Sequence, residues 1–204
     1  MKKNLVIAID GPSASGKGTL AKKIAAHFGL PYLNTGALYR LVAWRVMEQK
    51  IEPSEFEKHI GELVKNISES DLEPEELFSE KVGAVASIIA KNPKLRSALF
   101  DLQRDFVTNE KGAVLDGRDT TTVIAVDADF KFFVTADVEI RARRRFNQLQ
   151  SDFDEILAQL KRRDENDFGR ADAPLKIAPD AVVIDNGNLS IEEGFQKILQ
   201  IINS

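Results

Sequence analysis

Cysteine is absent from this chain of 204 residues, which excludes both a disulfide framework and a thiolate metal site. Only two histidines occur, His27 and His59, and neither has a nearby partner for metal or triad chemistry. Basic residues do not exceed acidic ones, at 28 against 32, so a general nucleic-acid binder is not indicated. The longest apolar runs are too short to span a membrane, and Asp10 ends the first one before it reaches signal-peptide length. We therefore expect a cytoplasmic protein that binds neither nucleic acid nor a membrane.

Short apolar runs do recur along the chain, and long helix-compatible stretches separate them. Continuous runs of this kind are typical of strands that are buried on both faces of a parallel sheet. Strands that alternate with helices indicate an α/β fold with right-handed crossovers. The prediction is a five-stranded parallel sheet flanked by helices, with strands at residues 5–9, 31–33, 113–115, 130–134 and 181–184.

A glycine-rich segment follows the first predicted strand. It contains Gly11 and then Gly16-Lys17 after four further residues, a spacing that lets backbone N–H groups surround phosphate oxygens while the lysine neutralises their charge. A helix is predicted from Lys17 to the cap at Gly29, and its positive end would face the same anion. Because Gly18 follows the lysine, the hydroxyl expected on Mg²⁺ is that of Thr19. The predicted ATP-binding loop comprises Gly11, Pro12, Ser13, Ala14, Ser15, Gly16, Lys17, Gly18 and Thr19.

Three further motifs follow this loop. They are Asn34-Thr-Gly-Ala-Leu-Tyr-Arg40, Asp116-Gly-Arg-Asp119 and Arg162-Arg-Asp-Glu-Asn-Asp-Phe-Gly-Arg-Ala-Asp-Ala-Pro-Leu175. In these four motifs and in their order, the chain resembles the bacterial cytidylate kinases, a family of P-loop kinases, over most of its length. The resemblance implies one kinase domain over residues 1–204, a shortened acceptor-side insert near residues 51–81 and a lid near residues 146–162. It also implies ATP and CMP or dCMP as substrates and Mg²⁺ as cofactor, and we expect a monomer.

The chemistry of such a reaction agrees with the residues present. A phosphate monoester is largely a dianion at neutral pH, so it is already nucleophilic and needs no general base. Transfer then depends on aligning two anions and neutralising their charge, which suits Arg, Lys and Mg²⁺. The predicted catalytic residues are Lys17, Arg118, Arg170 and Asp116, with Asp116 holding Mg²⁺ through water.

The resemblance also assigns the nucleotide contacts. Arg40, Arg118 and Arg170 are matched to the acceptor phosphate, and Thr35, Gly36, Tyr39, Arg163 and Asp167 to the sugar and its phosphate. Ser87, Arg96 and Asp119 are matched to the base: a carboxylate can accept from the exocyclic amine of cytosine, whereas uracil reverses that donor and acceptor pattern. Arg141, Arg144 and Arg145 are assigned to ATP as a group on one helix face, and residues 185–188 are predicted to contact the adenine.

The chain departs from the family pattern at Thr120-Thr121-Thr122, where Ile-Gly-Thr is usual, so the fit around the base or acceptor phosphate is expected to differ. Other functions of the same loop stay open: a kinase acting on AMP, UMP or a small alcohol, a regulator that hydrolyses or senses ATP, and an interaction protein without enzymatic activity. Arg96 and Asp119 favour cytosine, and the number of arginines outside the loop exceeds what one triphosphate needs.

Overall fold

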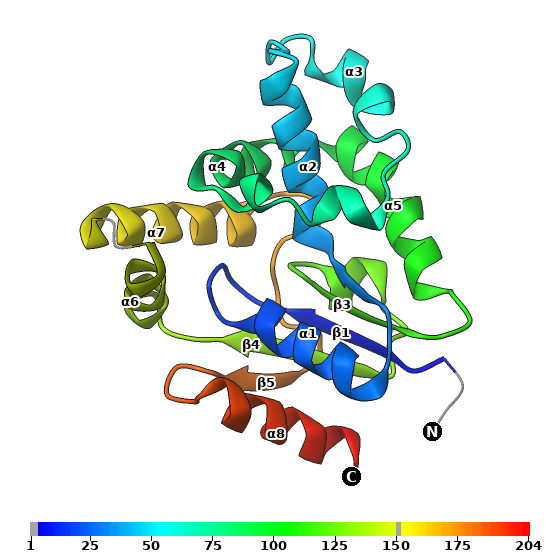
Figure 1. Cartoon of the computed structure of the whole chain (residues 1–204), viewed down its shortest axis with the longest axis vertical. Helices are drawn as coiled ribbons and strands as arrows, with labels where there is room; N and C mark the ends of the chain where they lie inside the picture. The colour runs from blue at the N-terminus through cyan, green and yellow to red at the C-terminus, as the bar shows by residue number, and fades with distance from the viewer. Residues whose placement is uncertain (1–3, 150–151) are drawn as a thin grey trace. The chain divides into compact units, whose positions relative to one another are not determined.

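The computed structural model, which describes residues 4–149 and 152–204, contains a five-stranded parallel sheet (Figure 1). Its strands lie in the order β2-β3-β1-β4-β5, and their bounds are Val6–Asp10 (β1), Tyr32–Asn34 (β2), Ala113–Gly117 (β3), Phe130–Thr135 (β4) and Val182–Asp185 (β5). The predicted fold class and all five predicted strands are confirmed, with bounds shifted by one or two residues. In the central pairing, Asp10 lies opposite Gly117, so β1 and β3 end side by side.

Helices cover the sheet because its strands carry apolar side chains on both faces. Ile7 and Ile9 on one face, and Ala8 and Leu115 on the other, are fully buried. Helix α1 (Lys17–Phe28) and helix α8 (Ile191–Ile202) run along the sheet (Figure 1) and share one core with it through residues such as Ile24 and Ile198. Gly29 ends α1 in the left-handed conformation, φ 64°, as the cap pattern predicts.

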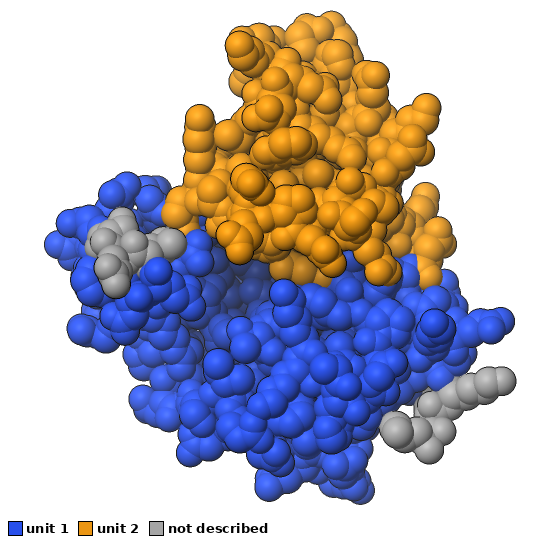
Figure 2. Space-filling model, in the orientation of Figure 1, with its two compact units in different colours: residues 1–33, 106–204 blue, residues 34–105 orange. Residues whose placement is uncertain are grey.

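The chain divides into two compact units (Figure 2). Unit 1 comprises residues 1–33 and 106–204 and contains the sheet apart from the last residue of β2. Unit 2 comprises residues 34–105 and is helical, with α2 (Thr35–Glu48), α3 (Phe56–Leu63), two 3₁₀ turns (η1, Glu69–Leu72, and η2, Glu75–Phe78), α4 (Glu80–Ile89) and most of α5 (Pro93–Val107). The predicted insert at residues 51–81 thus falls wholly within unit 2.

Two further helices of unit 1, α6 (Val138–Leu149) and α7 (Phe153–Gly169), pack on each other through a small apolar cluster of Ala142, Ile156 and Leu160. The predicted lid at residues 146–162 corresponds to the end of α6 and the first part of α7, except that residues 150 and 151 lie outside the described residues. None of the described helices combines the length and apolar character that crossing a membrane requires.

Candidate functional site

The phosphate loop connects β1 to α1 and requires glycine at two positions. Gly11 has φ 154°, and a Cβ atom there would lie 2.0 Å from the carbonyl oxygen of Val134. Gly16 has φ 89°, and a Cβ atom would lie 2.5 Å from Nδ2 of Asn186. A side chain at Gly11 would therefore clash with the backbone of β4, and one at Gly16 would displace the side chain of Asn186 and strain the positive φ.

Ser15 lies at a position of the phosphate loop where a ligand could bind. Its backbone carbonyl accepts a hydrogen bond of 2.8 Å from Nδ2 of Asn186, which holds the loop from the β5 side. Its Oγ is buried but has no hydrogen-bond partner among the described residues. Leaving a buried polar group unsatisfied costs about 1–3 kcal/mol, so a phosphate oxygen placed in the loop would relieve this cost.

Lys17 is a buried cation beside the loop. It is 8% exposed, and its Nζ donates to the carbonyl oxygen of Pro12 at 3.2 Å. Burial, and then repulsion from Arg118, lowers the pKa of Lys17 to about 7, although the carboxylates of Asp116 and Asp167 act in the opposite direction. An anion bound in the loop would restore the charged form of this lysine.

The carboxyl end of β3 carries Asp116, which is 3% exposed. The hydroxyl of Tyr32, on neighbouring strand β2, donates to its Oδ1 at 2.5 Å. Burial and this carboxylate both raise the pKa of Tyr32, so the tyrosine keeps its proton as the donor. A Cβ atom built at Gly18 would lie 3.6 Å from Oδ2 of Asp116, so the carboxylate faces the first turn of α1, next to Thr19.

This pair of oxygen donors fits Mg²⁺ rather than a more extensively ligated ion. Mg²⁺ is usually held by one or two carboxylates together with substrate phosphates and water. Asp116 and the hydroxyl of Thr19 are hard oxygen ligands of that type. Among the described residues there is no group of three or more His, Cys, Asp and Glu side chains that could hold a metal ion without a substrate.

The residues that follow β3 in the sequence, Arg118 and Asp119, each form an ion pair. Nε of Arg118 donates to Oδ2 of Asp167, on α7, at 2.5 Å. Burial acts to lower the pKa of Arg118, but the charge of Asp167 outweighs it and raises that pKa. One residue further, Oδ1 of Asp119 lies 3.7 Å from Nη2 of Arg170, whose Nε donates to the carbonyl oxygen of Ala173. The structure thus brings four predicted acceptor-binding residues together in unit 1.

The predicted ATP-binding arginines on α6 make extensive contacts within the protein. Arg141 is 4% exposed; its Nη1 donates to the carbonyl oxygen of Ser13 at 3.0 Å, and two of its nitrogens bind both carboxylate oxygens of Asp164, on α7. Arg144 donates to the carbonyl oxygens of Asn186 and Gly187 at 2.6 and 3.1 Å. These arginines hold the phosphate loop and the predicted adenine loop. Arg145 and Arg163 lie half-buried on α6 and α7.

The remaining predicted acceptor residues belong to unit 2. Thr35 and Gly36 begin α2, where Oδ1 of the capping residue Asn34 accepts from the N–H of Ala37 at 3.2 Å. The side chain of Asn34 thus supplies one of the hydrogen bonds that the helix start lacks.

Two arginines of unit 2, Arg40 and Arg96, are held by contacts within that unit. Arg40 on α2 donates to the carbonyl oxygens of Leu77 and Ser79 at 2.7 and 3.2 Å. The guanidinium of Arg96 is buried and lies 5.8 Å from the ring centroid of Tyr39. Ser87 is half-buried on α4. Their contacts with a nucleotide stay predictions.

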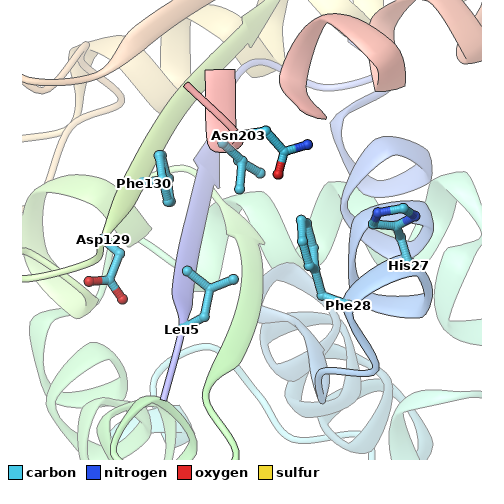
Figure 3. A pocket seen from close by; sticks show the side chains of 7 residues that line it. Leu5, His27, Phe28, Asp129, Phe130 and Asn203 are labelled. Carbon is cyan, nitrogen blue, oxygen red and sulfur yellow. The ribbon is translucent and has the colours of Figure 1, made fainter. Parts of the chain in front are cut away.

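A pocket of about 600 Å³ lies away from the phosphate loop, at the amino ends of β1 and β4 (Figure 3). Its lining consists of Leu5, His27, Phe28, Asp129, Phe130, Ile202 and Asn203. Among the residues that the structure describes, this lining holds one carboxylate and neither lysine nor arginine, so it offers no charge complementary to phosphate. The loop leaves the opposite, carboxyl end of β1, which is where ligands bind in open α/β sheets.

Several functional contacts were missed by sequence reasoning. Asp10 received no role, yet its buried carboxylate accepts hydrogen bonds from Thr120 and Thr121. A charged residue at the end of a buried apolar strand must find donors, and that rule was the available signal. Tyr32 and Asp164, the partners of Asp116 and Arg141, carried no comparable signal.

Comparisons with known proteins give a consistent result. A family model described as cytidylate kinase matches residues 7–204. A cytidylate kinase of Rhodopseudomonas palustris is 44% identical over 205 residues, covering 98% of this chain and 96% of the relative. One from Azorhizobium caulinodans is 46% identical over 204 residues, covering 97% and 98%. The crystal structure of shikimate kinase from Bacteroides thetaiotaomicron shares the fold, with a TM-score of 0.50 at 14% identity over 98% of this chain and 99% of that one.

Proposed function

The chain belongs to the cytidylate kinase family, and we propose that it transfers the γ-phosphate of ATP to CMP or dCMP, which gives ADP and CDP or dCDP. The observation that carries this proposal is the pairing of β1 with β3. Because Asp10 lies opposite Gly117, the phosphate loop after β1 and the pair Arg118-Asp119 after β3 leave the sheet side by side. A donor triphosphate and an acceptor phosphate bound at these two strand ends would be neighbours.

Charge neutralisation is the main task of the protein in this reaction. The acceptor phosphate is a dianion at neutral pH and attacks without a general base. Lys17 neutralises the donor phosphates, while Arg118 and Arg170 bind the acceptor phosphate through guanidinium groups that never deprotonate. The carboxylates of Asp167 and Asp119 hold these two arginines before the substrate arrives, which reduces the reorganisation needed during transfer.

The family and the donor set support Mg²⁺ as the cofactor, with Thr19 as a direct ligand and Asp116 acting through water. When bound there, Mg²⁺ would supply positive charge that helps to neutralise the donor phosphates. Tyr32 donates to one oxygen of Asp116, and both carboxylate oxygens lie near the first turn of α1, at 3.6 and 3.8 Å from a Cβ atom built at Gly18.

Recognition of cytosine is assigned to three side chains. Asp119 accepts from the exocyclic amine, while Arg96 and Ser87 hydrogen-bond to the remaining polar edge of the base. Uracil carries a carbonyl in place of that amine, so its binding would leave the carboxylate facing an acceptor. Sites built on such hydrogen bonds discriminate strongly because the mismatched analogue leaves buried groups unpaired.

The other nucleotide contacts fall into two groups, one for the acceptor nucleotide and one for ATP. The acceptor sugar and phosphate are assigned to Thr35, Gly36, Tyr39, Arg40, Arg163 and Asp167, and the ATP phosphates to residues 11–19 and the arginines of α6. Arg141 and Arg144 support ATP through the backbone carbonyls that they bind, and the contact with ATP is assigned to Arg141, Arg144 and Arg145 as a group. A monomeric state and a cytoplasmic location remain predictions.

The decisive experiment is a coupled phosphotransfer assay with MgATP against CMP, dCMP, UMP and AMP. We expect turnover with CMP and dCMP, and much lower kcat/KM with UMP and AMP. In Asp119→Ala, KM for CMP should rise by one to two orders of magnitude while KM for ATP changes little. Preference for AMP, UMP or a small alcohol would contradict the assigned acceptor, and ATP hydrolysis that no monophosphate accelerates would indicate an ATP-dependent regulator instead.

A further inference from the structure

Asp10, the last residue of β1, is fully buried immediately before the phosphate loop. Its Oδ1 accepts hydrogen bonds from the backbone N–H and the hydroxyl of Thr120, at 2.9 and 2.7 Å. Its Oδ2 accepts the equivalent pair from Thr121, at 2.8 and 2.6 Å. A single carboxylate thus receives four hydrogen bonds from two consecutive residues that lie 110 and 111 positions further along the chain.

These bonds fix the beginning of a short π-helical turn (η3, Thr120–Ile124). The first N–H groups of any helical turn lack partners within the turn, and Asp10 supplies acceptors for two of them. The turn then closes on Asp119, whose carbonyl oxygen accepts from the N–H groups of Val123 and Ile124 at 2.9 and 3.3 Å. The carbonyl group of Asp119 is therefore bonded to the turn whose first two residues are held by Asp10.

We propose that Asp10 is a positioning residue that sets the place of Asp119 through Thr120 and Thr121. The inference rests on the proposed function, in which Asp119 reads the acceptor base. Asp10 itself precedes Gly11 and lies opposite Gly117 in the sheet, so one buried side chain connects the start of the donor loop with the acceptor side of β3.

The energetic cost of losing these donors explains why the arrangement matters. Burial raises the pKa of Asp10, hydrogen bonds from Thr121 and Thr120 lower it, and the nearby charge of Asp119 raises it again. If one hydroxyl is removed, a fully buried carboxylate loses a donor and the turn must move to compensate. That movement would reach Asp119, which directly precedes Thr120 in the sequence.

The two hydroxyls allow a matched test in which shape and hydrogen bonding are separated. Thr121→Val removes the hydroxyl at nearly constant volume, and Thr121→Ser keeps it; the same pair is made at position 120. We expect Thr121→Val to raise KM for CMP on the order of tenfold, with KM for ATP changed less than about twofold, and Thr121→Ser to remain close to the wild type. Thermal unfolding and circular dichroism establish that each variant is folded.

A double-mutant cycle with Asp119→Asn distinguishes positioning from general weakening of the fold. If Thr121 acts through Asp119, the effect of Thr121→Val on KM for CMP should largely disappear in the Asp119→Asn background. Additive effects, equal changes in KM for CMP and ATP, or a loss of stability alone would overturn the positioning role. A wild-type enzyme that fails to phosphorylate CMP would instead contradict the proposed function, so the two failures are distinguishable. Asp10→Asn, which replaces one acceptor oxygen by a donor, should reproduce the effect if it folds.

Discussion

Replacement of Lys17 by methionine should make the protein more stable and nearly inactive. Lys17 is 8% exposed. Among the described residues, its Nζ donates one hydrogen bond, to the carbonyl oxygen of Pro12. The fall of its pKa from 10.5 to about 7 corresponds to at most about 5 kcal/mol of destabilisation, at about 1.4 kcal/mol per pH unit. Methionine removes that penalty but leaves the Pro12 carbonyl without its donor, which costs about 1–3 kcal/mol. A net gain of about 2 kcal/mol is therefore expected near pH 6.

The lowered pKa of Lys17 determines how the stability difference between Lys17→Met and the wild type changes with pH. The folded-state pKa lies below the unfolded value, so between pH 7 and 10.5 the unfolded protein binds more protons than the folded one. The stability of the wild type consequently rises with pH through that window, relative to a variant without the lysine. The advantage of Lys17→Met should be complete below pH 7 and should be lost as the pH approaches 10.5. Its kcat/KM, in contrast, should fall by about 10²–10³.

Urea unfolding followed by circular dichroism at several pH values from 6 to 10 would measure this effect. The control is Lys197→Met, which makes the same substitution at an exposed position of α8. If Lys17→Met were less stable than the wild type by the same amount at every pH, the reasoning that Lys17 is a desolvated cation awaiting an anion would be refuted. Coupled kinase assays on the same samples would separate loss of activity from loss of fold.

Three other predictions can be checked on the same material. Binding of MgATP should restore the proton on Lys17, so calorimetry at pH 8 in buffers of different ionisation enthalpy should show uptake of about 0.9 proton, and uptake near zero would contradict this. Gly11→Ala should destabilise the protein by about 3 kcal/mol or more in urea unfolding, because its Cβ would lie 2.0 Å from the Val134 carbonyl oxygen; an unchanged midpoint would disprove the strain. Thr122→Val should raise stability by about 1 kcal/mol, since Oγ1 of Thr122 is buried without a hydrogen-bond partner among the described residues, and a clear loss of stability would show that the hydroxyl is bonded.

Local patterns in the sequence were sufficient for the five strands, for helix α1 and for the position of the phosphate loop. Buried strands appear as continuous apolar runs, and helix α1 is delimited by Lys17 and by the left-handed Gly29. These features depend on backbone preferences and on burial within a few neighbouring residues, which a single sequence displays directly. The parallel sheet could be predicted for the same reason, because strands alternate with helical stretches along the whole chain.

Only the tertiary structure decided which side chains meet. Asp10 and Thr120, Tyr32 and Asp116, and Arg118 and Asp167 become partners because β3 lies between β2 and β1 and because α7 returns to this edge of the sheet. Their separations of 110, 84 and 49 residues leave no periodic signal in the sequence.

The division into units was likewise not evident, since the compact unit at residues 34–105 extends well beyond the acidic stretch at 51–81. Pairing and packing over such distances depend on strand order and register. Both are properties of the folded chain as a whole. Apolar runs, glycines and caps, in contrast, determine the conformation of the residues next to them in the sequence.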